Sequence, residues 1–147
     1  MPAPRIVTEV SSTVRRAGIS PAKVRQLVEA TLRSERISNA MISVAFVGRA
    51  AMARMNEKYL KHSGATDVIS FGMGRDGRGM PAVGDIYICP DVARENAKRN
   101  RIAISQELAR LVVHGTLHVA GHDHPDDDTR TTSPMWKKQE RILARAD

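Results

Sequence analysis

The sequence is poor in cysteine and in long apolar runs, and each shortage excludes a class of protein. One cysteine, Cys89, cannot form an internal disulfide, which excludes a disulfide-stapled secreted mini-protein and suits a reducing compartment. The longest apolar stretch, residues 40–48, is well short of the ~20 residues that span a bilayer. The chain also begins without the apolar segment of a secretory signal. We therefore expect a cytoplasmic protein with no membrane segment.

Aromatic residues are also scarce, at 3%, which disfavours nucleic-acid recognition by rows of base-stacking rings. Basic charge is plentiful: 23 Lys and Arg against 16 Asp and Glu give the 147 residues a net charge of +7. Residues 1–75 carry 12 basic and 5 acidic side chains, whereas residues 76–147 carry 11 of each. This excess makes a polyanionic partner held through its phosphates plausible, although composition alone slightly favours a protein with many solvated surface arginines.

Apolar periodicity and turn residues predict strands and helices without strict alternation, in a chain long enough for one domain with a substantial core. Strands are predicted at residues 5–10, 41–47, 68–71 and 83–89, and helices at residues 20–32, 50–60, 90–100, 105–119 and from 134. Ser20 and Ser105 are the expected helix caps, and Gly121 is the expected stop of the fourth helix. The pattern favours a single α+β domain over residues 1–147.

Three of the five histidines are spaced as metal ligands. His114 and His118 lie four residues apart on a predicted helix, so that their imidazoles share one face. Gly121 can end this helix in a left-handed conformation, after which the chain can bring His124 back as a third ligand. Three imidazoles with an open fourth position are typical of catalytic zinc sites. We therefore predict that these histidines bind a metal ion.

The same spacing occurs in the metzincin zinc proteases, but one residue differs. Those enzymes carry a general-base glutamate directly after the first histidine, where this chain has Gly115. A peptidase that depends on that glutamate cannot operate here, so a substrate phosphate oxygen or another side chain must handle the proton. The acidic run that follows, Asp123 and residues 126–128, is either a solvated loop or contains a carboxylate that orients a ligand imidazole.

Residues 114–124 resemble the signature H-G-x-L-H-L-x-G-Y-D-H of the YbeY-type endoribonucleases, with Val119 and His122 in place of Leu and Tyr. Two further blocks are similar to the same family. Residues 56–71 resemble N-x-x-Y-R…P-T-D-V-L-S-F, and residues 84–88 resemble G-D-I-x-I.

The resemblance implies a single α+β domain in which a small mixed sheet packs against helices and a zincin-like helix carries the metal histidines beside a cleft. It implies one Zn²⁺ per chain on His114, His118 and His124. The implied activity is single-strand-specific, zinc-dependent RNA cleavage in small-subunit rRNA 3′ end maturation and ribosome quality control. RNA and the small ribosomal subunit are the implied partners, and no feature specifies an oligomeric state.

The chain departs from the family pattern beside the second block. Leu60 replaces an arginine that contacts RNA, and Lys61 is the nearest cation that could take its catalytic role, although lysine lacks the bidentate fork of arginine. We therefore expect a basic surface beside the metal cleft, including Lys61. Thr66, Ser70 and Asp85 are candidate substrate-binding residues, or else residues that stabilise strands. Further candidates for contacts with the RNA backbone are Arg94, Lys98 and Arg99.

Two other functions stay open. A metallohydrolase of peptides or small amides would use the same metal, although Gly115 and the basic charge disfavour it. A non-catalytic assembly factor would use zinc structurally and bind the small ribosomal subunit through its basic face. An open fourth coordination position would favour catalysis, a fourth protein ligand would favour structure, and nickel would also bind imidazoles.

Overall fold

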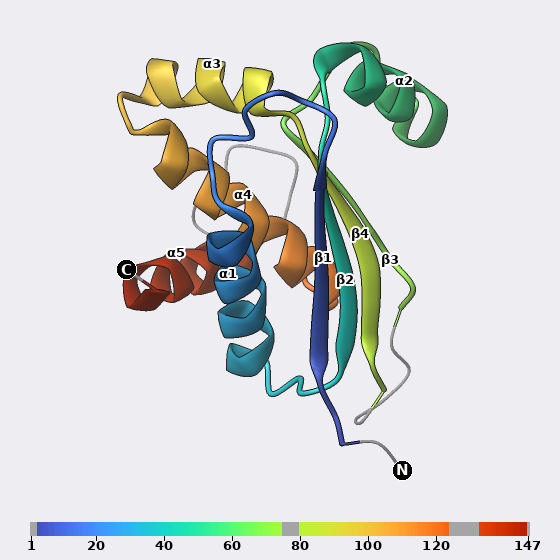
Figure 1. Ribbon diagram of the computed structural model, residues 1–147, viewed down its shortest axis with the longest axis vertical. Helices are drawn as coiled ribbons and strands as arrows, with labels where there is room; N and C mark the ends of the chain where they lie inside the picture. The colour runs from blue at the N-terminus through green and yellow to red at the C-terminus, as the bar shows by residue number, and fades with distance from the viewer. Residues whose placement is uncertain (1–2, 75–79, 124–132, 147) are drawn as a thin grey trace.

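A mixed four-stranded sheet forms the centre of the protein in the computed structural model, which describes residues 3–74, 80–123 and 133–146 (Figure 1). The strands lie in the order β1-β2-β4-β3, and β2 pairs in parallel with both β1 and β4, while β3 runs antiparallel to β4. Their bounds are β1 Ile6–Ser12, β2 Ala40–Phe46, β3 Val68–Gly72 and β4 Ala82–Ile88. The expected α+β class with a small mixed sheet is confirmed.

Helices cover one face of this sheet and one end of the other face (Figure 1). Their bounds are α1 Pro21–Ser34, α2 Arg49–Leu60, α3 Pro90–Asn100, α4 Ile104–Val119 and α5 Pro134–Ala146. The main core lies between the sheet and the helices α1, α4 and α5, and a smaller cluster around Met52 of α2 packs on the opposite face. Within the described residues, no helix has the length and apolar character needed to cross a bilayer.

The helix ends show why the local sequence patterns work. The hydroxyl of Ser20 accepts a hydrogen bond from the Lys23 amide at 3.1 Å, which caps α1 as expected. Gly121, at φ 108°, ends α4: its amide donates to the His118 carbonyl, and the His122 amide donates to the Leu117 carbonyl. These two bonds form a Schellman motif, which satisfies the last carbonyls of α4 and reverses the chain.

The expected cap of α4 is wrong by two residues. Ala103, in an extended conformation, occupies the cap position and offers no side-chain hydrogen bond, while Ser105 lies in the first turn. The left-handed Arg101 ends α3 only two residues earlier, so the tight connection between the helices starts α4 before the serine.

Helix α4 packs unusually close to strand β4, and two glycines make this possible. A Cβ on Gly115 would lie 2.7 Å from Cγ2 of Ile86, and a Cβ on Gly84 would lie 2.7 Å from Cγ1 of Val119. Both distances are below van der Waals contact. Position 115 therefore faces the sheet, and a glutamate there would be driven into the core instead of toward a substrate.

Gly115→Ala should consequently destabilise the fold, although alanine normally favours a helix by about 1 kcal/mol over glycine. Overpacking against Ile86 costs about 1–3 kcal/mol, which should lower the melting temperature by several degrees. Gly48→Ala is the control, because a Cβ there meets nothing within 4 Å and the variant loses only the preference for glycine at the N-cap of α2. Thermal unfolding followed by circular dichroism measures both variants, and equal melting temperatures would contradict the packing argument.

Candidate functional site

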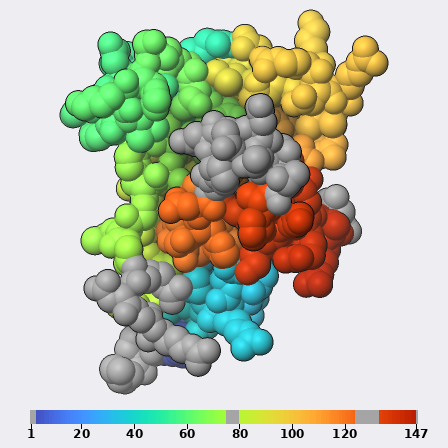
Figure 2. All heavy atoms as spheres, turned by 180° about the vertical axis from the view of Figure 1, so that it is seen from behind, coloured from blue at the N-terminus to red at the C-terminus, as the bar shows by residue number. Residues whose placement is uncertain are grey.

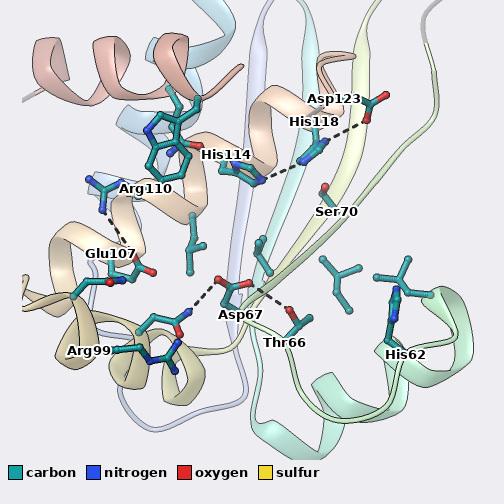
Figure 3. A pocket seen from close by; sticks show the side chains of 18 residues that line it. His62, Thr66, Asp67, Ser70, Arg99, Glu107, Arg110, His114, His118 and Asp123 are labelled. Carbon is teal, nitrogen blue, oxygen red and sulfur yellow. Dashed lines mark hydrogen bonds and ion pairs between the residues drawn. The ribbon is translucent and has the colours of Figure 1, made fainter. Parts of the chain in front are cut away.

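A cleft of about 780 Å³ opens along the edge strand β3, between the helices α3, α4 and α5 (Figure 3). Seen from behind, the C-terminal half of α4 comes to the surface beside α5 (Figure 2). The described residues that line the cleft come from these elements, from the end of α2 and its connection to β3, and from the turn after α4: Leu60, His62, Thr66, Asp67, Val68, Ile69, Ser70, Asn96, Arg99, Asn100, Glu107, Arg110, Leu111, His114, His118, Asp123, Trp136 and Gln139.

The predicted histidine pair lies in this cleft, with both rings half-buried. His114 and His118 are one turn apart on α4, and their Nε2 atoms approach to 3.2 Å (Figure 3). Two nitrogens that share a tetrahedral zinc ion at about 2.0–2.1 Å lie roughly 3.3–3.4 Å apart. The donor atoms and their spacing therefore fit two ligands of one metal ion.

The remaining ring nitrogens of both histidines face polar groups. Nδ1 of His114 lies 2.7 Å from Oε1 of Gln139, and Nδ1 of His118 lies 3.7 Å from Oδ1 of Asp123. Metal-binding histidines usually hold a carboxylate, carbonyl or water on the second nitrogen. Of the acidic run, Asp123 is the residue that the structure describes, and it lies beside the imidazole of His118, a predicted ligand.

The third predicted ligand, His124, and the acidic residues 126–128 lie outside the described residues. Among the residues that are described, no three His, Cys, Asp or Glu side chains gather in a metal-binding arrangement. His122, whose spacing does not match the ligand pattern, contacts the carboxylate of Glu35. The structure therefore places two of the three predicted metal ligands.

The carboxylate of Glu35 holds the turn that follows α4. Glu35, at the end of α1, accepts hydrogen bonds from His122 and, at 2.6 Å, from Lys138 of α5. Burial disfavours the ionised carboxyl, but these two hydrogen bonds outweigh it and hold the pKa of Glu35 below its ordinary value. Glu35 thus ties α1 and α5 to the C-terminal end of α4, the helix that carries the predicted ligands.

A buried carboxyl group of α4, Glu107, lines the end of the cleft away from the histidines. It is 6% exposed, and burial together with the nearby charge of Asp67 raises its pKa, despite an ion pair with Arg110 at 3.7 Å. Asp67 in turn accepts a hydrogen bond from the Asn96 amide at 3.2 Å. A buried carboxyl with a raised pKa inside a cleft is a feature common in functional sites.

Arg110 is a further charged residue of the cleft wall. It forms a bidentate ion pair with Glu140 of α5, at 2.8 and 3.0 Å, and lies 5.8 Å from the centre of the Trp136 ring. Burial raises the pKa of Glu140, but hydrogen bonds from Arg110 and Gln139 outweigh it and set that pKa below its ordinary value. Glu140 is therefore an ionised acceptor.

The structure brings some of the predicted substrate residues to the histidines and leaves others apart. Thr66 and Ser70 line the cleft. Lys61 is the exposed left-handed residue that ends α2, and it is not among the lining residues, although both of its neighbours are. Asp85 lies on the sheet face opposite α4, where it accepts a hydrogen bond from Ser43 at 2.6 Å. Of the four residues predicted to act on the substrate, only Thr66 and Ser70 line the described cleft.

The candidate cations of α3 also differ in whether they line the cleft. Arg94 pairs with Asp91 at 2.8 Å and donates to the Arg16 carbonyl at 2.9 Å, outside the cleft. Arg99 is exposed and lines the cleft, and its guanidinium has no ion pair or hydrogen bond with any residue of the described ranges. Lys98, its neighbour on the helix, does not line the cleft.

Sequence reasoning missed Glu35, Glu107 and Gln139. Glu107 could have been found, because it lies seven residues before His114 and so on the same helix face. Glu35 and Gln139 carry no such signal, since each reaches its partner only through packing between helices distant in the sequence.

Known proteins with similar sequences show which family the chain resembles. The family model described as "Endoribonuclease YbeY" matches residues 10–147. A protein named "Endoribonuclease YbeY" from Kineococcus radiotolerans is 37% identical over 145 residues, covering 93% of this chain and 83% of that protein. A protein of the same name from Chlorobium luteolum is 35% identical over 126 residues, covering 84% of this chain and 89% of that protein.

A solved structure also agrees with the fold. The solution structure of a Thermotoga maritima protein matches with a TM-score of 0.63 and 24% identity, covering 95% of this chain and 89% of that chain. Fold and site thus define an α+β protein with a histidine-bearing helix along a cleft. The chain belongs to the Endoribonuclease YbeY family.

The raised pKa of Glu107 predicts how pH affects stability. The folded protein holds the Glu107 proton more tightly than the unfolded chain, so stability falls as pH rises from the unfolded pKa, near 4.5, through the folded pKa. Glu107→Gln removes this pH-dependent loss, so the melting temperature of the variant should rise relative to that of wild type as the pH is raised. Thermal scans of both proteins between pH 4.5 and 8 measure this difference in melting temperature. A variant that is as stable as wild type at pH 4.5 but less stable at pH 7.5 would contradict the raised pKa of Glu107.

Proposed function

We propose that this protein is a zinc-dependent endoribonuclease that cleaves single-stranded RNA, with the metal held by His114, His118 and His124. The observation that carries the proposal is the pair of Nε2 atoms, 3.2 Å apart inside a cleft, in a chain of the Endoribonuclease YbeY family. The family relatives bear the name endoribonuclease, which supports RNA as the substrate. We further propose that the substrate is the 3′ region of small-subunit rRNA, and that the protein serves ribosome quality control in the cytoplasm.

The residues of the cleft would have separate roles in RNA hydrolysis. Zinc bound to imidazoles supplies Lewis-acid catalysis for phosphodiester hydrolysis. Gly115 faces the sheet, so it leaves the proton transfer to another group. Glu107 has a raised pKa in the same cleft, but it lies seven residues and about 10 Å along α4 from His114, too far to transfer a proton at the histidines. Thr66 and Ser70 offer hydroxyl groups along the β3 wall.

The cation that contacts the RNA backbone in this cleft is Arg99. Its guanidinium lines the cleft and has no acidic partner among the described residues, whereas Arg110 is engaged by Glu140. Arginine contacts phosphate through two parallel N–H bonds, which a lysine cannot reproduce. Lys61 lies outside the lining and would contact RNA only at the rim, next to Leu60.

Replacement of the three ligands tests the metal. The triple variant His114→Ala, His118→Ala and His124→Ala should lose zinc, measured by elemental analysis of the purified protein, and should lose RNA cleavage. His62→Ala is the matched control, because His62 lines the same cleft but stands outside the ligand spacing. Unchanged cleavage by the rigorously purified triple variant would rule out the metal mechanism.

Arg99→Ala tests the phosphate contact. One lost contact with single-stranded RNA should reduce the slope of log K against log salt by about 0.7, and affinity should fall at low salt. Lys98→Ala removes the same charge from the same helix outside the cleft, so its slope should match wild type. Fluorescence anisotropy at several salt concentrations measures both, and equal slopes for the two variants would exclude Arg99 as the specific contact.

A further inference from the structure

Gln139 of α5 is hydrogen-bonded to His114, a predicted metal ligand. It is 0% exposed, and its amide lies between the imidazole of His114 on α4 and the carboxylate of Glu140 on its own helix. A fully buried amide must find partners for its N–H groups and its oxygen, or the fold loses stability. The orientation of this amide therefore has consequences for both neighbours.

Glu140 determines which way the amide points. Its carboxylate is held in a bidentate ion pair by Arg110, at 2.8 and 3.0 Å, so it acts only as an acceptor. Gln139 must then turn its NH₂ group toward Glu140, to which it donates at 3.0 Å. The amide oxygen is left facing Nδ1 of His114, at 2.7 Å.

The oxygen of Gln139 in turn decides the tautomer of His114. An amide oxygen only accepts hydrogen bonds, so Nδ1 of His114 must carry the proton and donate it to Gln139. In a neutral imidazole the other nitrogen then carries the lone pair. That nitrogen, Nε2, is the atom directed at Nε2 of His118, where two ligands of one metal ion would meet.

We propose that Gln139 is a positioning residue of the metal centre, which holds His114 in the Nδ1–H tautomer and so presents the Nε2 lone pair to the metal. Arg110, Glu140 and Gln139 form a hydrogen-bonded chain that ends on His114. The inference rests on the proposed function in one respect, because it takes His114 to be a metal ligand. The tautomer itself follows from the hydrogen bonds alone.

The chain of hydrogen bonds also fixes the direction of the ring. Arg110 is on α4, one turn before His114, while Glu140 and Gln139 are on α5, so the network joins the two helices at the level of the ligand. The ring of His114 cannot rotate about its bond to Cβ without breaking the 2.7 Å contact to a buried amide. Gln139 thus preorganises the ligand before the metal arrives.

The direct test measures the wild-type, metal-free protein and uses one variant only to identify signals. Long-range ¹H–¹⁵N correlation spectra at pH 8 distinguish a protonated ring nitrogen from one that carries a lone pair, and His114→Ala identifies the His114 signals. We expect a protonated Nδ1 and an unprotonated Nε2 for His114. A His114 ring protonated on Nε2 would overturn the proposal.

Zinc affinity, measured by competition with a chromophoric chelator, tests the consequence for the metal. Gln139→Leu keeps a buried side chain but removes the acceptor, and loss of such a partner typically weakens metal binding by about 10–100-fold. The exchange variant, Gln139→Glu with Glu140→Gln, restores an acceptor for Nδ1 at unchanged net charge. It should bind zinc at least as tightly as wild type.

The outcomes separate this proposal from the proposed function. If His114→Ala loses zinc while Gln139→Leu binds it as tightly as wild type, Gln139 has no positioning role and the metal site stands. If His114→Ala binds zinc as wild type does, the assigned ligand set is wrong, and both proposals are overturned. Weakened binding in Gln139→Leu that the exchange variant does not restore would assign Gln139 a packing role only and overturn the proposal.

Discussion

The close contact between α4 and β4 sets the position of the rest of the site. Gly115 meets Ile86 and Gly84 meets Val119 at distances that leave no room for a Cβ. Successive residues of a helix differ by about 100° around its axis, so a helix seated on Gly115 must turn His114 and His118 away from the sheet centre. They face the β3 edge, where Ser70 lies, and α5, which supplies Gln139. The same glycine therefore supports the packing and excludes a general base at its own position.

A second constraint is that the cleft buries charge. Glu107, Arg110 and Glu140 lie within one connected group: burial raises the pKa of Glu107, Arg110 offsets part of this rise, and the charge of Glu140 adds to it. Removing one member of a buried pair leaves its partner uncompensated, which is more costly than the pair itself. The three side chains therefore depend on one another inside the cleft.

The sequence predicts the parts of this protein that depend on local spacing. The four-residue interval between His114 and His118, the stop at Gly121 and the cap at Ser20 all follow from backbone geometry within one turn, and the structure confirms each. It does not predict contacts made across the fold. Gln139 meets His114, and Glu35 meets His122, only because helices distant in the sequence pack together. Asp85 belongs to a predicted strand, but the register of β4 turns it away from α4.

The position of charged side chains in the cleft likewise depends on the fold and not on the local sequence. The net excess of +7 lies in residues 1–75, which suggested a basic surface there beside the metal cleft. The Lys and Arg residues that line the described cleft, Arg99 and Arg110, both belong to the electrically neutral half of the chain. Net charge acts over distances up to the Debye length of about 8 Å and attracts a polyanion before contact. A hydrogen bond to one phosphate requires a guanidinium already in place. Under the proposed function, the basic half would therefore steer RNA toward the protein, and Arg99 would set where the strand lies.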